Sequence, residues 1–191
     1  MPKLILIRHS QSQLDPALPA SRWSLSEVGR ERCMALAQRL ATYAPAAIIA
    51  SREPKAIETG SIVATILGIP FETADGLHEH KREHVAFIPN EAFDATIAAL
   101  FERPDELVMG EETANRARER FEQAVRSVLD RYPGRNVAIV THGTVMTLFV
   151  AKHTGVASLP FWKSLGMPAL VVLSLPEFGL LEVVERLEIG D

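Results

Sequence analysis

Two short apolar segments of the sequence each run directly into a histidine, and this repeated pattern constrains the fold more than any other feature. Residues 3–7 are followed by Arg8 and His9, and residues 136–140 are followed within two positions by His142. Short runs rich in β-branched residues predict buried strands. Ligands of open α/β sheets bind at the edge where the carboxyl ends of parallel strands meet. Neighbouring placement of the two strands would therefore bring both histidines and Arg8 to one pocket.

The rest of the chain alternates between strand-like and helix-like segments. Ser26 is a suitable N-cap for a helix that ends before Pro45, and Gly68 is a suitable stop for the next helix. Further strands are predicted at residues 46–50 and 71–73, and further helices at residues 92–101, 111–132 and 144–152. This alternation predicts a three-layer α/β/α fold with a mostly parallel central sheet and right-handed crossovers.

Two regions depart from the alternation. Residues 77–110 are dense in charge and punctuated by prolines, and we interpret them as a small, lid-like insertion. Residues 170–175 and 180–187 predict a hairpin that forms an antiparallel edge of the sheet. No repeat or linker interrupts the sequence, so we expect residues 1–191 to form a single domain.

The composition excludes several classes of protein. The 191 residues, 47% of them hydrophobic, fit one domain with a large core. A net charge of −4 gives no basic footprint for nucleic acid, so we expect a small substrate. Cys33 is the only cysteine, which excludes an internal disulfide and a multi-cysteine zinc site and favours a buried, apolar role for that residue.

Targeting and membrane signals are also missing from the sequence. The N-terminal segment lacks the basic and long apolar regions of a signal peptide, and no run approaches the roughly 18 residues of a membrane span. We therefore expect a soluble cytoplasmic protein with neither a nucleic-acid nor a membrane partner. The pattern indicates no particular oligomeric state.

A pocket with two imidazoles and an arginine suits a dianionic phosphoryl group. One histidine can attack the phosphorus while the positive charges neutralise the phosphoryl oxygens. A single histidine at a strand end is more often an ordinary polar residue, but two such strand ends in one chain form a more specific pattern. We therefore expect phosphoryl chemistry at this edge of the sheet.

Five landmarks along the chain resemble the histidine phosphatase superfamily, also called the phosphoglycerate mutase-like family. The landmarks are Arg8-His9-Ser10, Leu25-Ser26-x-x-Gly29, Ser51-x-x-x-Lys55-Ala56-x-x-Thr59, Leu77-x-Glu79 and Val140-Thr141-His142-Gly143. They follow the family's order over nearly the whole chain. The resemblance implies a central mixed sheet flanked by helices, in agreement with the periodicity.

The resemblance also implies a role for each matching residue. His9 would take up the phosphoryl group as a phosphohistidine, and Glu79 would protonate the leaving oxygen and then activate water. His142 would complete the catalytic set, and the phosphate-binding residues would be Arg8, Ser10, Lys55, His142 and Gly143. The resemblance implies neither a metal ion nor a cofactor. Burial and the nearby Glu83 are expected to raise the pKa of Glu79, and Glu83 is the competing candidate for the acid.

Two positions differ from the family pattern. Ser10 stands in place of a glycine, and its hydroxyl can donate to a phosphoryl oxygen. Lys55 stands in place of an arginine, which keeps the charge but loses the planar, two-pronged donor. Arg52 is an alternative source of that donor, although its position favours a solvated surface residue.

Residues 78–84 allow a second interpretation of the chemistry. His78, His80 and His84, together with two glutamates, are residue types that ligate zinc or manganese. The segment lacks the apolar period of a helix, which favours a solvated, charged loop over a metal site.

Three functions are consistent with these patterns. The leading one is a metal-independent phosphatase of small phosphomonoesters. A phosphoglycerate mutase-like phosphotransferase is a narrower alternative, because the chain lacks the longer insertions of the mutases that it resembles. A catalytically weak phosphate-binding module is the non-enzymatic alternative, which the differences at Ser10 and Lys55 would permit.

Overall fold

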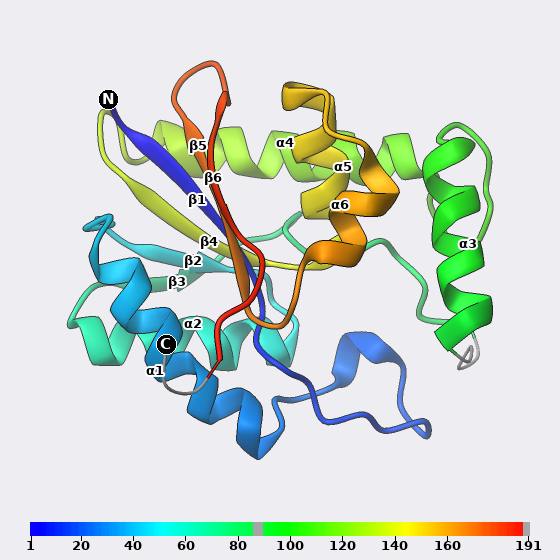
Figure 1. Ribbon diagram of the computed structural model, residues 1–191, viewed down its shortest axis with the longest axis horizontal. Helices are drawn as coiled ribbons and strands as arrows, with labels where there is room; N and C mark the ends of the chain where they lie inside the picture. The colour runs from blue at the N-terminus through cyan, green and yellow to red at the C-terminus, as the bar shows by residue number, and fades with distance from the viewer. Residues whose placement is uncertain (86–89, 189–191) are drawn as a thin grey trace.

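The computed structural model of the protein describes residues 1–85 and 90–188 (Figure 1). The strands are β1 (Lys3–Arg8), β2 (Ile48–Ala50), β3 (Phe71–Thr73), β4 (Val137–Thr141), β5 (Ala169–Ser174) and β6 (Leu180–Val184). The helices are the short 3-10 helix η1 (Ala20–Arg22), α1 (Glu27–Ala41), α2 (Pro54–Leu67), α3 (Asn90–Glu102), α4 (Ala114–Asp130), α5 (Gly143–Thr154) and α6 (Ser158–Ser164).

The strands form one mixed sheet in the order β3-β2-β4-β1-β5-β6. The first four strands of this order are parallel, whereas β5 pairs antiparallel with both β1 and β6. The hairpin of β5 and β6 therefore supplies the antiparallel edge that the sequence predicted. The predicted α/β fold with a mostly parallel central sheet is confirmed.

Each face of the sheet has its own hydrophobic core, and successive side chains of β1 point alternately into one core and the other. Leu4 and Leu6 pack with α4 and α5, whereas Ile5 and Ile7 pack with α1 and α2. Figure 1 shows these two helix pairs on opposite sides of the strands. Such double coverage explains why the central residues of β1 and β4, Leu4–Ile7 and Val137–Val140, are all apolar, with no polar alternation.

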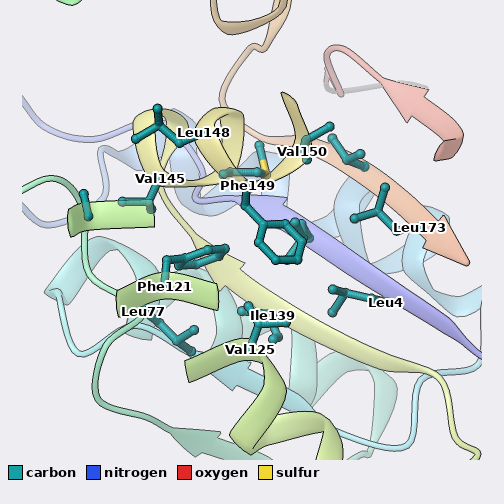
Figure 2. Close-up of a cluster of buried hydrophobic side chains, with 14 of the residues drawn as sticks. Leu4, Leu77, Phe121, Val125, Ile139, Val145, Leu148, Phe149, Val150 and Leu173 are labelled. Atoms are coloured by element: carbon teal, nitrogen blue, oxygen red, sulfur yellow. The ribbon is translucent and has the colours of Figure 1, made fainter. Parts of the chain in front are cut away.

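Aromatic side chains fill the centre of the core between the sheet and α4 and α5 (Figure 2). The ring of Phe121 in α4 meets the ring of Phe149 in α5 edge to face, with 5.6 Å between their centroids. Both rings are completely buried and lie over Leu4 and Ile139 of the sheet. Leu77, which precedes the Glu79 landmark by two residues, is buried in the same cluster.

The Leu25-Ser26-x-x-Gly29 landmark has a structural explanation at the start of α1. The hydroxyl of Ser26 caps the helix by accepting the backbone N–H of Gly29 at 3.0 Å. A Cβ on Gly29 would lie only 2.1 Å from the carbonyl oxygen of Gln11. Only glycine therefore allows α1 to lie this close to the segment that follows β1.

Two helices differ from the sequence prediction. Helix α4 begins at Ala114 because the hydroxyl of Thr113 caps it by accepting the N–H of Arg116 at 3.2 Å. Glu111 therefore precedes the helix and does not belong to its first turn. Helix α6 was not predicted, because its seven residues include Pro160 and are too short to show a helical period.

The segment interpreted as an insertion, residues 77–110, is anchored in the core. Ile97 and Leu100 of α3 are fully buried, and α3 packs against α6. Residues 86–89 of the segment lie outside the described residues. Within residues 1–85 and 90–188, no helix combines the length and the apolar character that crossing a membrane requires.

The buried aromatic pair allows a test of the packing. We expect Phe121→Ala to lower the free energy of unfolding by about 3–5 kcal/mol, because the substitution leaves a cavity where a large ring was buried. Chemical denaturation measures this loss. The matched control is Leu107→Ala, at a side chain that is 62% exposed, with an expected change within about 0.5 kcal/mol. Equal effects of the two substitutions would contradict the described core.

Candidate active site

The parallel pairing of β1 with β4 brings the two histidines together. Arg8 is in register with Thr141, and the backbone N–H of His9 donates to the carbonyl of Thr141 at 3.0 Å. His9 directly follows β1, and His142 directly follows β4. The centroids of their rings are 5.2 Å apart. The neighbouring placement inferred from the sequence is therefore the arrangement in the structure.

The imidazole of His9 is held in one orientation by a backbone carbonyl. Its Nδ1–H donates to the carbonyl oxygen of Ser10 at 2.7 Å, so the lone pair of the neutral ring is on Nε2. Burial, followed by the nearby His142 and Lys55, holds the pKa of His9 well below its usual range. The free protein therefore carries a neutral His9, which is the nucleophilic form of an imidazole.

His142 is positioned by the Ser51 landmark. Its Nε2 lies 2.9 Å from the hydroxyl of Ser51 and 3.4 Å from Oε1 of Glu53. Burial, together with the charge of Lys55, holds the pKa of His142 well below its usual range. His142 is thus neutral in the free protein.

Arg8 approaches the start of α5 very closely, and Gly143 makes this approach feasible. A Cβ on Gly143 would lie 3.1 Å from both Cζ and Nε of Arg8. The guanidinium of Arg8 also donates to the carbonyl of Leu165. The Arg8 side chain therefore reaches the cavity next to the first N–H groups of α5, which favour an anion.

Lys55 lies at the N-terminal end of α2 and is paired with a carboxylate that the sequence analysis did not single out. Its Nζ lies 2.7 Å from Oε2 of Glu53 and also donates to the carbonyl of Ala20. The side chains of Lys55 and Glu53 are only 6% and 11% exposed. Glu53 thus contacts both a cation and an imidazole of the site, and no motif in the sequence pointed to it.

Ser10 does not lie among the residues that line the cavity, which corrects the expected phosphate contact. Its hydroxyl donates to the carbonyl of Gly29 at 2.6 Å, and its backbone N–H donates to the hydroxyl of Thr59 at 3.0 Å. Thr59 in turn donates to the carbonyl of Lys55 at 2.7 Å. Ser10 and Thr59 therefore join the end of β1 to α1 and α2.

Glu79 is bound to the N-terminus of α5. Its Oε2 accepts the N–H of Thr144 at 3.0 Å, and its Oε1 accepts the N–H groups of Val145 at 3.1 Å and His80 at 2.9 Å. Burial raises the pKa of Glu79, but the charge of Arg82 and these N–H groups outweigh it and lower the pKa well below the usual range. The structure thus contradicts the expectation of a raised pKa.

The segment that carries Glu79 is braced from two sides. The hydroxyl of Thr141 in β4 donates to the carbonyl of Leu77 at 2.9 Å. From α4, the guanidinium of Arg120 donates to the carbonyls of Gly76 at 2.7 Å and Glu79 at 3.1 Å and pairs with Glu112 at 2.6 Å. These contacts fix the backbone around Glu79.

A cavity of about 360 Å³ opens above the two histidines. Arg8, His9, Lys55, Glu79, His142 and Gly143 line its inner part. Its outer wall is largely apolar and includes Leu14, Leu18, Pro19, Trp23, Val85, Phe93, Trp162 and Met167. The cavity therefore combines an anion-binding base with room for an apolar group.

Arg82 is a cavity residue that sequence reasoning missed. Its guanidinium lies 4.9 Å from the ring centroid of Phe93, and its Nη1 is buried without a hydrogen-bond partner among the described residues. Glu83 is exposed and does not line this cavity. In the sequence, both residues belonged to the same charged run, which gave no signal to separate them.

The histidines of residues 78–84 have separate environments. His78 contacts Arg120, His80 lies 2.7 Å from the carbonyl of Glu112, and His84 pairs with Glu111 at 2.9 Å. The described part of the chain contains no group of three or more histidine, cysteine or acidic side chains that could hold a metal ion. This geometry favours the interpretation of the segment as a charged loop.

The sheet, the two strand-end histidines and the cations around them are the features of a phosphoryl-handling α/β protein. The chain belongs to the histidine phosphatase superfamily (branch 1), whose pattern matches residues 4–178. No curated protein matches the sequence. The assignment therefore comes from the family pattern and from similar structures.

Three of the solved structures that resemble this protein cover nearly its whole length. Bacillus stearothermophilus YhfR is 25% identical, with a TM-score of 0.75 over 97% of this chain and 96% of that one. A mycobacterial glucosyl-3-phosphoglycerate phosphatase is 18% identical, with a TM-score of 0.74 over 100% and 99% of the two chains. The phosphoserine phosphatase of Entamoeba histolytica, solved with 3-phosphoglyceric acid, is 14% identical, with a TM-score of 0.77 over 99% and 100%.

The buried histidines of the site, His9 and His142, predict that the protein loses stability as the pH falls. Because burial lowers their pKa values, the folded protein keeps His9 and His142 neutral at a pH where the unfolded chain protonates them. Unfolding therefore takes up protons below about pH 6.5. As the pH falls through this range, each of these histidines lowers the free energy of unfolding by about 1.4 kcal/mol per pH unit. Urea denaturation at several pH values measures this slope.

Two variants separate the contribution of the buried histidines from other effects of pH on stability. His142→Gln should lower this slope by up to about 1.4 kcal/mol per pH unit between about pH 6.5 and pH 5.5, because it deletes one buried group, whereas the buried His80 keeps its own contribution. His84→Gln, at a side chain that is 88% exposed, is the matched control. Glu79 adds a loss in the same direction, but only at the lower pH where glutamates take up protons. A stability independent of pH in the histidine window would contradict the buried, neutral imidazoles.

Proposed function

We propose that this protein is a phosphatase that hydrolyses small phosphomonoesters through a phosphohistidine on His9. One observation carries the proposal: the carbonyl of Ser10 holds Nδ1–H of His9 at 2.7 Å, which leaves the lone pair of Nε2 for attack on phosphorus. His9 also lines a cavity with Arg8 and Lys55, whose charges complement a phosphoryl group.

The first step places the phosphoryl group between the strand ends and α5. Arg8, Lys55, His142 and the N–H of Gly143 hold its oxygens, and His9 forms a bond to phosphorus as the bond to the leaving oxygen breaks. The charge that spreads over the equatorial oxygens in the transition state is neutralised by the cations. A phosphoryl ligand next to His142 also favours protonation of that imidazole.

The second step releases phosphate and regenerates His9. Glu79 takes a proton from a water molecule, whose oxygen attacks the phosphorus while the bond to Nε2 of His9 breaks. This division into two steps replaces one difficult displacement by two easier ones. Arg8 and Lys55 supply the positive charge at the phosphoryl group, so the proposed reaction uses neither a metal ion nor a cofactor.

We propose a small phosphorylated metabolite as the substrate and the cytoplasm as the location. The names of two similar structures, a glucosyl-3-phosphoglycerate phosphatase and a phosphoserine phosphatase with 3-phosphoglyceric acid, support a small phosphorylated molecule. The single, unpaired Cys33 is in keeping with a reducing compartment. Residues 77–110 are proposed to form a lid-like part of the single domain beside this site.

The phosphohistidine is tested by trapping it. Rapid quench with a labelled aryl phosphate should give an acid-labile, base-stable phosphoprotein, followed by steady release of phosphate. His9→Ala should abolish both, because no other side chain replaces its Nε2. Label on His142 would contradict the assigned roles.

The same measurement distinguishes the alternative functions. A mutase would form the phosphoprotein but transfer its label to an added sugar acid rather than to water. A phosphate-binding module would form no phosphoprotein. Either result would overturn the proposed phosphatase.

Lys55 provides a test of the phosphate-binding set. Lys55→Ala should lower kcat/KM by about ten- to a thousandfold, because a charge-assisted contact to the phosphoryl group is lost. Lys55→Arg should retain more activity, since it keeps the charge. Steady-state kinetics with one aryl phosphate measure all variants.

Arg52 provides the matched control for Lys55. It belongs to the same landmark, but its side chain is 63% exposed and pairs with Asp75 at 2.9 Å. Arg52→Ala should therefore leave kcat/KM nearly unchanged. A near-normal Lys55→Ala together with a strong loss in Arg52→Ala would transfer the phosphate contact to Arg52.

A further inference from the structure

Glu53 is a buried carboxylate to which the proposed reaction assigns no step. It directly precedes α2, its side chain is only 11% exposed, and it does not line the cavity above the two histidines. Its Oε1 accepts the backbone N–H of Glu79 at 2.9 Å and lies 3.4 Å from Nε2 of His142. Its Oε2 lies 2.7 Å from Nζ of Lys55. Glu53 therefore contacts three residues that line the cavity without lining it itself.

The contact with Glu53 limits what Lys55 can offer to a phosphoryl group. An ammonium group has three N–H donors, and in Lys55 two of them face Glu53 and the carbonyl of Ala20. One donor remains for a phosphoryl oxygen, and the carboxylate compensates part of the positive charge. Since a phosphoryl group carries up to about two negative charges, a further positive charge beside Arg8 would match it better.

His142 has a ring nitrogen that could bind this group. The imidazole lines the cavity, and its side chain is only 1% exposed. Its Nε2 faces Glu53 and the hydroxyl of Ser51, whereas Nδ1 is buried and has no hydrogen-bond partner within the described residues. Because buried polar atoms normally have a partner, we expect Nδ1 to be the ring atom that contacts a phosphoryl oxygen.

The charged groups around His142 act on its protonation in opposite directions. They are Arg8 and His9 at the end of β1, Glu53 and Lys55 at the start of α2, and His78, Glu79 and Arg82 in residues 74–85. In the free protein, burial and the charge of Lys55 outweigh the carboxylates, and the pKa of His142 is low. A bound phosphoryl group adds negative charge beside the ring, which together with Glu53 favours the charged form of the imidazole.

We propose that Glu53 is a positioning residue that lets His142 take up a proton when the phosphoryl group binds. The proton comes from solvent. Because both nitrogens of an imidazolium carry hydrogen, the ring then donates from Nε2 toward Ser51 and Glu53 and from Nδ1 to a phosphoryl oxygen. Binding thus creates a cation at the phosphoryl group that the free protein does not carry. This inference rests on the proposed phosphatase function and adds a residue to its phosphate-binding site.

Nitrogen-15 NMR of the imidazole rings tests the proton uptake in the wild-type protein. His142→Gln identifies the signals of His142 by their loss. Without phosphate, His142 should stay neutral as the pH falls to about 6. With saturating inorganic phosphate, the pH at which half of the His142 rings are protonated should rise by about one to three units, because an opposite charge lies next to the ring.

Variants assign the effect to Glu53. Glu53→Gln keeps an acceptor for the N–H of Glu79 but removes the charge, so the midpoint of His142 in the phosphate complex should fall by about one pH unit or more. Glu53→Asp keeps the charge and should give a midpoint between the two. Glu58→Gln is the matched control, because it makes the same change in the same helix at a carboxylate that pairs with Arg30 at 2.8 Å. It should leave the midpoint unchanged.

Activity gives a second measure of the same proton. Glu53→Gln should lower kcat/KM for an aryl phosphate by about tenfold near pH 8 and by less near pH 6, since a lower pH returns the proton to His142. A purely structural role of Glu53 would give the same loss at both pH values. Glu58→Gln should match the wild-type protein at both.

Three results would overturn the inference while leaving the phosphatase in place. They are a His142 midpoint that phosphate does not raise in the wild-type protein, a Glu53→Asp midpoint no higher than that of Glu53→Gln, and a loss of kcat/KM in Glu53→Gln that is independent of pH. Failure of the proposed function would appear separately, as a wild-type protein that forms no phosphoprotein in the rapid-quench experiment. That result would remove the inference as well.

Discussion

The candidate site depends on the register between β1 and β4. Because Arg8 pairs with Thr141, both strands end at the same level and each delivers its histidine to the same edge. A shift of one residue would turn every side chain of β1 to the opposite face, exchanging Leu4 and Leu6 for Ile5 and Ile7 in the two cores. The packing of both cores therefore holds the register, and the register holds the distance between His9 and His142.

Charge is balanced within the site by contacts that reach across several elements. Glu53 pairs with Lys55 from α2, lies near His142 after β4, and accepts the backbone N–H of Glu79 at 2.9 Å. Burying a lysine without such a partner would be unfavourable, because a charge loses its hydration in the interior. The same carboxylate therefore pairs with the buried Lys55 and helps to place the three groups around the cavity. Arg120 acts similarly farther out, where it ties backbone carbonyls near Glu79 to α4.

Local sequence signals predicted much of this arrangement. The apolar runs of β1 and β4 located both histidines, and the capping Ser26 located α1. The pairing of Thr59 with Ser10 and of Ser51 with His142 explains two positions that the resemblance had marked without a physical reason. Contacts between distant segments were not predictable in this way. Glu53, Arg82 and Arg120 join residues that are far apart in the chain or lie in charged runs, where periodicity does not distinguish a cavity residue from a solvated one.

The inner and outer residues of the cavity occupy different positions in the fold. This difference affects how the substrate of such a protein can change during evolution. Apart from Glu79, the inner residues occupy strand ends and the starts of helices, next to the sheet. The outer wall consists of side chains such as Leu14, Phe93 and Trp162, which belong to no strand; Leu14 is exposed, and Phe93 and Trp162 are partly buried. Under the proposed function, point substitutions in this wall can change which alcohol is accepted while the phosphoryl chemistry persists. Gene duplicates of such a chain could therefore acquire new substrates without first rebuilding the catalytic centre.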